Sequence, residues 1–237
     1  MSGLAQRSGG RVRQDNEALI LAAAEATFAE YGFKGASMGM IALRAGLPKA
    51  NLHYYFGNKQ TLYMAVLGRI LQLWTESFDT LSIDDEPAEA LSRYIRNKLE
   101  FSWRNPLASK VFAMEVISGG ACLEAHFNLD FRDWFRGRAQ VFRAWSAAGK
   151  MDPVDPIHLI FLLWSSTQHY ADFATQIGSI LGQSGGVERE MEEICGNLTT
   201  IILKGCGVRG DITRQSLTNS TAVSSSLCST GARLGME

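Results

Sequence analysis

Residues 37–56, with the sequence SMGMIALRAGLPKANLHYYF, hold the densest group of side chains that can bind a polyanion. On a short helix, Leu52 and Phe56 are four residues apart and face a core together. The residues left on or near the outer side are Lys49, Asn51, His53, Tyr54 and Tyr55. Such donors and rings suit phosphates, base edges and sugars. The segment therefore predicts a nucleic-acid-binding surface; the competing interpretation is that the aromatic block only packs a small three-helix core.

Two short helices and a tight turn are needed to hold this surface. Ser37 suits the cap of a first helix over Met38–Ala45, because its hydroxyl accepts a hydrogen bond from a free backbone N–H. Gly46 suits a left-handed turn, and Pro48 suits the start of a second helix over 49–55, where its missing N–H loses no hydrogen bond. The pattern predicts a helix-turn-helix.

Ser37 also lies in Gly35-Ala36-Ser37-Met38-Gly39, which fits the G-x-S-x-G pattern of hydrolase nucleophiles. That motif needs a strand before the serine and a helix after it. Here the serine follows a helical pattern, and no strand–helix alternation occurs along the chain. We therefore interpret Ser37 as a cap and expect no enzyme activity.

Helical periodicity dominates the sequence, strand-like alternation is nearly absent, and all five prolines stand where helices could begin or end. An all-α fold is therefore expected. Outside the helix-turn-helix, the expected helices span about residues 15–31, 58–81, 87–104, 106–119, 122–148, 156–181 and 187–206.

Four segments follow from these patterns. Residues 1–13 are rich in Gly, Ser and Arg and are expected to form a flexible basic arm, residues 14–60 form the helix-turn-helix domain, residues 61–206 form a larger helical domain, and residues 207–237 form a disordered tail. Residues 1–60 carry seven basic and four acidic side chains, whereas residues 61–206 carry thirteen and eighteen. A basic head on an acidic body is typical of a nucleic-acid reader joined to a separate domain.

No metal site, cofactor or membrane span is expected. The four cysteines form no CxxC pair, and His158 and His169 share a helix face about 16 Å apart, too far for one ion. Neither an apolar stretch of about 18 residues nor a signal-peptide core is present, so a cytoplasmic protein is expected.

A second candidate site is indicated by Trp164 and Gln168, which are four residues apart on one helix face. The amide of Gln168 offers a donor and an acceptor in one plane, which suits the edge of a cyclic imide or amide. Trp74 could supply a flat wall, and stacking of a planar ring adds about 1 kcal/mol. Ordinary core packing of the tryptophans, with Gln168 satisfied by the backbone or by a second subunit, is the alternative.

The run IALRAGLPKANLHYYFGNKQTLYMAVL, residues 41–67, resembles the signature of the TetR family of transcriptional regulators. In that signature a helix-turn-helix ends in an aromatic L-Y-x-x-F block, followed by a basic residue and a fourth helix. The resemblance covers about residues 15–67 and implies a TetR-like fold. An N-terminal three-helix helix-turn-helix domain would bind double-stranded operator DNA, and a C-terminal helical domain would bind a small-molecule effector and form a homodimer.

The same resemblance implies a set of DNA-binding residues. These are Ser37, Met38, Lys49, Asn51, His53, Tyr54, Tyr55 and Lys59. His53, where the family usually has tyrosine, and Lys59 would hold phosphates, and Met38 would act through its backbone amide. Gly39 stands where some members place a base-contacting side chain, so base reading is expected from the second helix of the motif.

Three further stretches resemble the RutR subfamily of TetR-type proteins, which are repressors of pyrimidine utilisation. They are ILQLW at 70–74, KLEFSWRNPLASKVFAMEVISGG at 98–120 and DPIHLIFLLWSSTQHYADFATQI at 155–177. The resemblance covers about residues 15–205. It implies that Trp74, Trp164 and Gln168 line a pocket for uracil or thymine, with Phe112, Glu115 and Tyr170 as neighbours.

Dimerisation is expected because a helix-turn-helix protein reads two half-sites about 34 Å apart on palindromic DNA. The family resemblance places the interface on the last two helices. The apolar stripe expected there consists of Met191, Ile194, Leu198, Ile201 and Ile202. An effector bound between the fourth and eighth helices would shift the fourth helix and release DNA. The alternative is a DNA-bound scaffold or regulator with a different effector or none.

Overall fold

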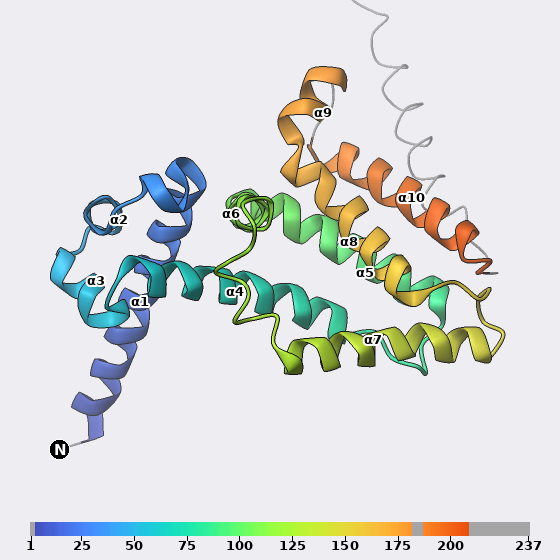
Figure 1. Ribbon diagram of the computed structural model, residues 1–237, viewed down its shortest axis with the longest axis horizontal. Coiled ribbons are helices and arrows are strands. Elements are labelled where there is room, and N and C mark those ends of the chain that lie inside the picture. The colour runs from blue at the N-terminus through green and yellow to red at the C-terminus, as the bar shows by residue number, and fades with distance from the viewer. Residues whose placement is uncertain (1–2, 182–186, 209–237) are drawn as a thin grey trace, which may run out of the picture.

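The computed structural model describes residues 3–181 and 187–208, and within these ranges the elements are ten α-helices (Figure 1). The helices are α1 (Gly3–Gly35), α2 (Met38–Ala45), α3 (Lys49–Phe56), α4 (Lys59–Asp79), α5 (Pro87–Arg104), α6 (Pro106–Ile117), α7 (Leu129–Ala147), α8 (Pro156–Asp172), α9 (Ala174–Leu181) and α10 (Val187–Gly205). The all-α prediction is confirmed.

The helix-turn-helix forms for the local reasons expected from its sequence. Ser37 caps α2, and its Oγ accepts from the Met40 N–H at 3.2 Å. Gly46 adopts a left-handed conformation with φ of 65°, which a side chain would strain. Its N–H then reaches the last carbonyl groups of α2, and Pro48 leads directly into α3.

Caps and prolines also set the other helix boundaries. The side chain of Asn58 accepts from Thr61 N–H at 2.9 Å and starts α4, and that of Asp155 accepts from Ile157 N–H at 2.8 Å and starts α8. Pro87 and Pro106 occupy the first turns of α5 and α6. These starts agree with the sequence predictions.

At its N-terminal end, α1 differs from its prediction. It begins at Gly3, so residues 3–13 are helical, whereas the sequence predicted a helix only from about residue 15. The segment contains no proline, and a stable helix that follows can extend backwards at one hydrogen bond per residue. The expected end of the helix at Gly32 is present as a break with φ of 67°.

Two predicted helices of the larger domain are also interrupted. The helix expected over 122–148 begins only at Leu129, because Asn128 caps it by accepting from Phe131 N–H at 3.0 Å. The helix expected over 156–181 breaks at Phe173 into α8 and α9. The expected disordered tail at 207–237 lies outside the described residues from 209 onward.

Two hydrophobic clusters divide the molecule into a head and a body. The head cluster consists of Ile20, Ala23, Ala24, Phe28, Ala29, Ala36, Met38, Ile41, Ala42, Leu52, Phe56, Leu62, Tyr63, Val66, Leu67, Ile70, Leu71, Ala108, Val111 and Leu123. The body cluster consists of Phe78, Leu81, Ala90, Leu91, Tyr94, Ile95, Leu99, Ala139, Val141, Phe142, Trp145, Met151, Leu159, Ile160, Leu163, Ile194, Cys195, Ile202, Leu203 and Cys206. Helix α4 contributes to both, and Figure 1 shows it running from the head into the body.

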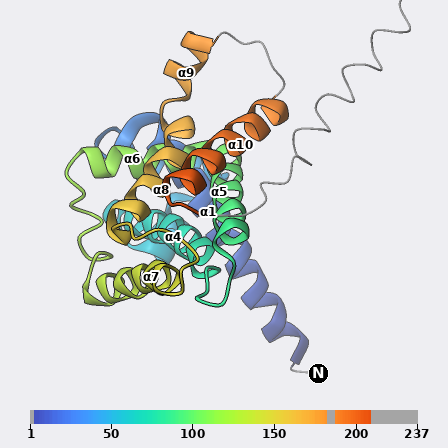
Figure 2. The ribbon, with the colours of Figure 1, turned by 90° about the vertical axis from the view of Figure 1, so that its right-hand side faces the viewer.

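The body is a bundle in which α5 packs against both α8 and α10. Seen from the side, α8 and α10 lie next to each other on one face, and α9 projects beyond them (Figure 2). None of the described helices is long and apolar enough to span a membrane.

Replacing Gly46 with alanine is expected to destabilise the protein by about 1–2 kcal/mol, because a Cβ is unfavourable at this positive φ. Gly39→Ala is the matched control, since Gly39 lies in α2 with no close obstacle to a Cβ and alanine favours helix by up to about 1 kcal/mol. Urea unfolding of both variants measures the difference. Equal stability of the two variants would contradict a left-handed turn at Gly46.

Candidate functional site

The outer face of α3 carries the polar side chains predicted there. Lys49 and His53 are exposed, Asn51 is half-buried, and Tyr54 is 75% exposed. The ring of Tyr54 meets that of Tyr55 edge-on at a centroid distance of 5.2 Å, which holds the exposed ring in place. This face presents a cation, an amide and a phenol together to solvent.

Two of the predicted DNA-binding residues form hydrogen bonds within the head. Tyr55 is half-buried, and its hydroxyl accepts from Asn16 Nδ2 at 3.5 Å. Lys59 Nζ donates to the carbonyl oxygens of Phe33 and Ala36, at 2.8 and 2.9 Å, and lies 4.7 Å from the centroid of the Phe33 ring. Because an ammonium group has three N–H donors, Lys59 retains one for a phosphate.

The remaining predicted contacts have defined geometry. His53 Nδ1 donates to the Gly57 carbonyl at 2.7 Å, so in a neutral ring Nε2 is an acceptor. His53 can therefore donate to a phosphate only as the doubly protonated imidazolium. The hydroxyl of Ser37 is used as a cap acceptor, and the side chain of Met38 is buried, which leaves Met38 its backbone amide for any contact.

A cavity of about 380 Å³ lies where the head and body clusters meet, between α4, α5, α6, α7 and α8. Pockets of this size accommodate small organic ligands. Its wall includes four of the predicted ligand-binding residues, which are Trp74, Phe112, Trp164 and Gln168. The structure therefore brings together side chains that are up to 94 positions apart in the sequence.

Aromatic side chains form most of the cavity wall. Trp74 and Phe112 meet edge-on with ring centroids 4.4 Å apart, and Phe127, Phe131 and Trp134 close another side. One polar atom on a lining residue, Trp74 Nε1, is buried without a hydrogen-bond partner among the described residues. Unpaired buried donors are costly, so a ligand with acceptor oxygens is favoured here.

Four polar side chains form a connected network at one end of the cavity. Lys98 Nζ donates to Gln168 Oε1 at 3.0 Å, and Gln168 Nε2 donates to Ser109 Oγ and, at 3.4 Å, to Asp172 Oδ1. Ser109 Oγ in turn donates to Asp172 Oδ1 at 2.7 Å. Gln168 is thus held between a cation and a carboxylate.

Lys98 is the residue that the sequence reasoning missed. It is 3% exposed, and burial lowers the pKa of its ammonium group to about 7, with the opposing charge of Asp172 limiting the shift. Its Nζ lies 3.7 Å from the centroid of the Trp74 ring. The signal was present, because Lys98 falls at helical spacing between the buried residues Leu91 and Ser102 on the apolar face of α5.

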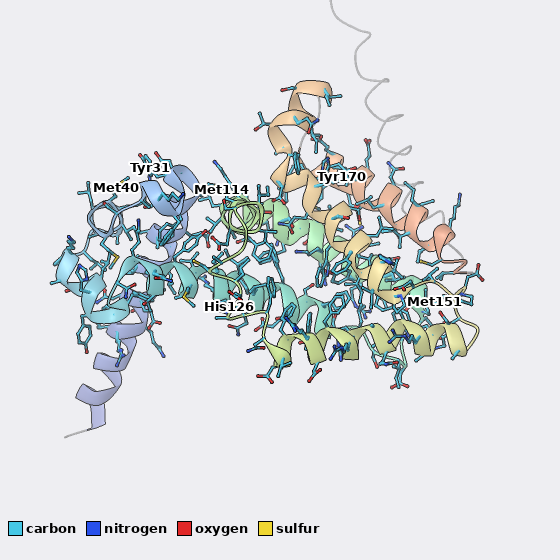
Figure 3. The ribbon with its side chains drawn as sticks, in the orientation of Figure 1. Tyr31, Met40, Met114, His126, Met151 and Tyr170 are labelled. Atoms are coloured by element: carbon cyan, nitrogen blue, oxygen red, sulfur yellow. The ribbon has the colours of Figure 1, made fainter. Side chains whose placement is uncertain are left out.

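Glu115 and Tyr170, the other predicted neighbours of the ligand, are not part of the cavity wall. The buried Glu115 carboxylate accepts from the Cys122 N–H at 2.7 Å, and burial, with Glu115 nearby, raises the pKa of Tyr63. It therefore fixes the chain after α6 to the head cluster. Tyr170 is half-buried against the body cluster on α8 (Figure 3).

The apolar stripe predicted for the dimer interface divides between two environments. Ile194 and Ile202 are 9% and 3% exposed and belong to the body cluster of their own chain, so they are not available to a second copy. Ile201 is 66% exposed, whereas Met191 and Leu198 are half-buried. The helical spacing was right, but α5 takes up one side of the stripe.

Two known families match consecutive parts of this chain. Residues 20–66 match the family described as "Bacterial regulatory proteins, tetR family", and residues 67–209 match "YcdC-like protein, C-terminal region". The HTH-type transcriptional regulator RutR of Escherichia coli (strain K12) is 40% identical over 186 residues, which cover 78% of this chain and 88% of RutR.

Solved structures share the fold at lower identity. A TetR-like transcriptional regulator from Rhodococcus sp. RHA1 superimposes with a TM-score of 0.60 at 20% identity, covering 82% of this chain and 97% of that one. AibR, in complex with isovaleryl coenzyme A and operator DNA, gives a TM-score of 0.61 at 19% identity, covering 78% of this chain and 97% of AibR. These two likenesses establish the fold.

The buried ammonium of Lys98 gives a prediction about stability and pH. Because folding lowers its pKa from 10.5 to about 7, the folded state holds fewer protons than the unfolded state between these values. This group therefore adds to stability as pH rises from 7 to 10, by at most about 1.4 kcal/mol per pH unit, and destabilises the fold below pH 7.

Lys98→Met is expected to be more stable than the wild type at pH 6 and to lose that advantage by pH 10, because methionine leaves no buried charge. Urea unfolding at pH 6, 8 and 10 measures the difference between the two proteins. Lys110→Met, which removes an exposed lysine, is the control. A stability difference that does not vary with pH would contradict a buried, titrating Lys98.

Proposed function

The chain belongs to the TetR family of bacterial regulatory proteins, and we propose that it is a homodimeric repressor released from a palindromic operator by uracil or thymine. As a family member it is a DNA-binding transcriptional regulator and not an enzyme. One observation carries the proposal for the effector. The aromatic cavity, with Trp74, Trp164 and Gln168 in its wall, borders the same helix that packs the DNA-binding head.

For DNA recognition we assign the exposed face of α3. Lys49 and Tyr54 extend from it into solvent, and Asn51 lies beside them, so they are placed to meet bases and backbone in a major groove. Lys59 contributes one remaining N–H, and His53 contributes when its ring is charged. Tyr55 supports Tyr54 from the inner side.

For the effector we assign a single planar heterocycle with carbonyl oxygens. The cavity offers aromatic walls for the ring and an unpaired donor, Trp74 Nε1, for an oxygen. Uracil and thymine have this chemistry, and the resemblance to repressors of pyrimidine utilisation supports them. A scaffold without an effector would need the space between Trp74 and Trp164 to be filled by side chains, which the cavity of about 380 Å³ opposes.

For dimerisation we assign the neighbouring outer faces of α8 and α10. Phe161 and Leu162 on α8 are 50% and 52% exposed, and Ile201 on α10 is 66% exposed. Exposed large apolar side chains of this kind are typical of a surface that is covered in the assembled protein. A two-fold axis through this face would form a four-helix bundle and join two heads for two half-sites.

The release mechanism we propose runs through α4. Trp74 lies at the cavity, and six residues earlier Gly68 lies against the imidazole of His126, which a Cβ on Gly68 would approach to 3.0 Å (Figure 3). His126 is next to Phe127 of the cavity wall. A ligand can therefore act on α4 in two places. It can displace Trp74 directly, or it can displace Phe127 and so move His126 against Gly68. A hundredfold loss of operator affinity needs about 2.7 kcal/mol of preferential binding to the released state.

Lys49→Ala is expected to weaken operator binding roughly tenfold or more, because a hydrogen bond to a charged group contributes about 1.5–3 kcal/mol. It should also reduce the slope of log K against log salt by about 1 per head. Arg143→Ala removes an exposed cation from α7 in the body and serves as the control. Fluorescence anisotropy across a salt series measures both. An unchanged slope for Lys49→Ala would remove Lys49 from the DNA interface.

Uracil and thymine are expected to release the dimer from its operator. Gel-shift titration with each base, and with adenine as a purine of similar flatness, provides the measurement. Operator binding that persists at millimolar uracil and thymine would reject the pyrimidine effector while leaving the DNA-binding assignment intact.

A further inference from the structure

Gln168 is less available to a ligand than its position suggests. Both amide hydrogens of its Nε2 are taken up, by Ser109 Oγ and by Asp172 Oδ1, and its Oε1 already accepts from Lys98. A carbonyl oxygen has two lone pairs, so Gln168 can still accept one hydrogen bond and has none left to donate. The donor that an effector carbonyl requires must come from another residue.

Lys98 can supply that donor. Lys98 is part of the cavity wall, and its ammonium group uses one of its three N–H groups for Gln168. Among the described residues, none of the ion pairs includes Lys98. A buried cation that lacks a direct anionic partner gains strongly from an acceptor oxygen placed against it.

The charges around Lys98 are few. From α8, Asp172 faces it through the Gln168 amide, and His169 is a further lining residue. The other elements packed around the cavity contribute aromatic, aliphatic and hydroxyl side chains to its wall. The ammonium group is therefore the one cationic lysine or arginine donor in the described lining, and its surroundings do not neutralise it by direct contact.

We propose that Lys98 recognises the effector by a hydrogen bond: its ammonium group donates to a ring carbonyl oxygen, while Gln168 Oε1 accepts from the ring N–H beside that oxygen. A carbonyl next to an N–H is the edge of a lactam or cyclic imide. The ring would take the place over Trp74 that the ammonium now occupies at 3.7 Å, and the flexible lysine stem would carry Nζ to the ring edge. This inference rests on the proposed effector function.

This contact couples effector binding to the protonation of Lys98. At pH 8 a large part of the free protein has Lys98 uncharged, because burial lowers its pKa to about 7. A carbonyl oxygen held against Nζ favours the ammonium form, so the ligand must bring a proton with it above pH 7. Affinity then falls with rising pH by up to about tenfold per unit.

Calorimetric titration of the full chain with uracil tests the proposal, at pH 6 in phosphate and in bis-tris buffer and at pH 8 in phosphate and in Tris buffer. Heats that differ between buffers at pH 8 report proton uptake, and we expect up to one proton per site there and almost none at pH 6. Lys98→Met is expected to bind uracil at least tenfold more weakly and without proton uptake. Lys110→Met, an exposed lysine replaced in the same way, should match the wild type.

Gln168→Glu provides a second variant that keeps the acceptor oxygen and places a carboxylate beside Lys98. It should move the pH dependence of uracil binding to higher pH, because the carboxylate favours the charged lysine. An unmoved pH dependence would count against Lys98 as the titrating group. Near-UV circular dichroism verifies that each variant keeps its tertiary packing.

The remaining outcomes separate the two proposals. If the Lys98→Met variant binds uracil as tightly as the wild type, or more tightly, Lys98 does not recognise the effector, and the effector proposal itself still stands. Tighter binding would identify the lysine as a competitor for Trp74 and Gln168. Failure of the wild type to bind either uracil or thymine rejects the pyrimidine effector and this inference together.

Discussion

The packing of α4 is the constraint on which the rest of this structure depends. Its first half buries Leu62, Leu67 and Ile70 in the head cluster, and its last turns bury Phe78 in the body cluster. A helix of 21 residues is about 31 Å long and moves as a rigid rod over such a distance. Two hydrophobic cores that share one rod cannot shift independently, so α4 couples the body to the head; α6, which packs against both α1 and α8, is a second link.

The start of α4 is fixed to the helix-turn-helix, and its last turns border the cavity. At its start, Lys59 binds the carbonyl oxygens of Phe33 and Ala36, directly before the cap of α2. Near its end, Trp74 borders the cavity and carries the ammonium of Lys98 on its ring. A ligand that replaces the lysine on Trp74 acts on the same helix whose first residue orients the helix-turn-helix. Lys59 therefore fixes the start of α4 to the head, in addition to the phosphate contact proposed for it.

The sequence predicts what local chemistry decides. Ser37, Asn58 and Asp155 cap helices with their own side chains, so helix starts could be placed without the fold. The sequence does not predict features that depend on tertiary packing, such as which side chains are buried. Lys98 lies on the apolar face of α5, but its charge argued for exposure, and its burial in the structure shows that it points inward. Ile202 looked like an interface residue because periodicity cannot tell which neighbour covers an apolar stripe.

The central claim, that a ligand in the cavity moves the two heads through α4, is tested most directly by the distance between them. Spin labels at Ala50, exposed on α3, introduced as an unnatural residue because the chain has native cysteines, report this distance in the dimer by double electron–electron resonance. Without ligand, the account predicts a narrow distribution suited to half-sites about 34 Å apart. Saturating uracil should displace it by a few ångströms, as helix shifts of about 1–2 Å at α4 are amplified. Superimposable distributions with and without bound uracil would contradict the account.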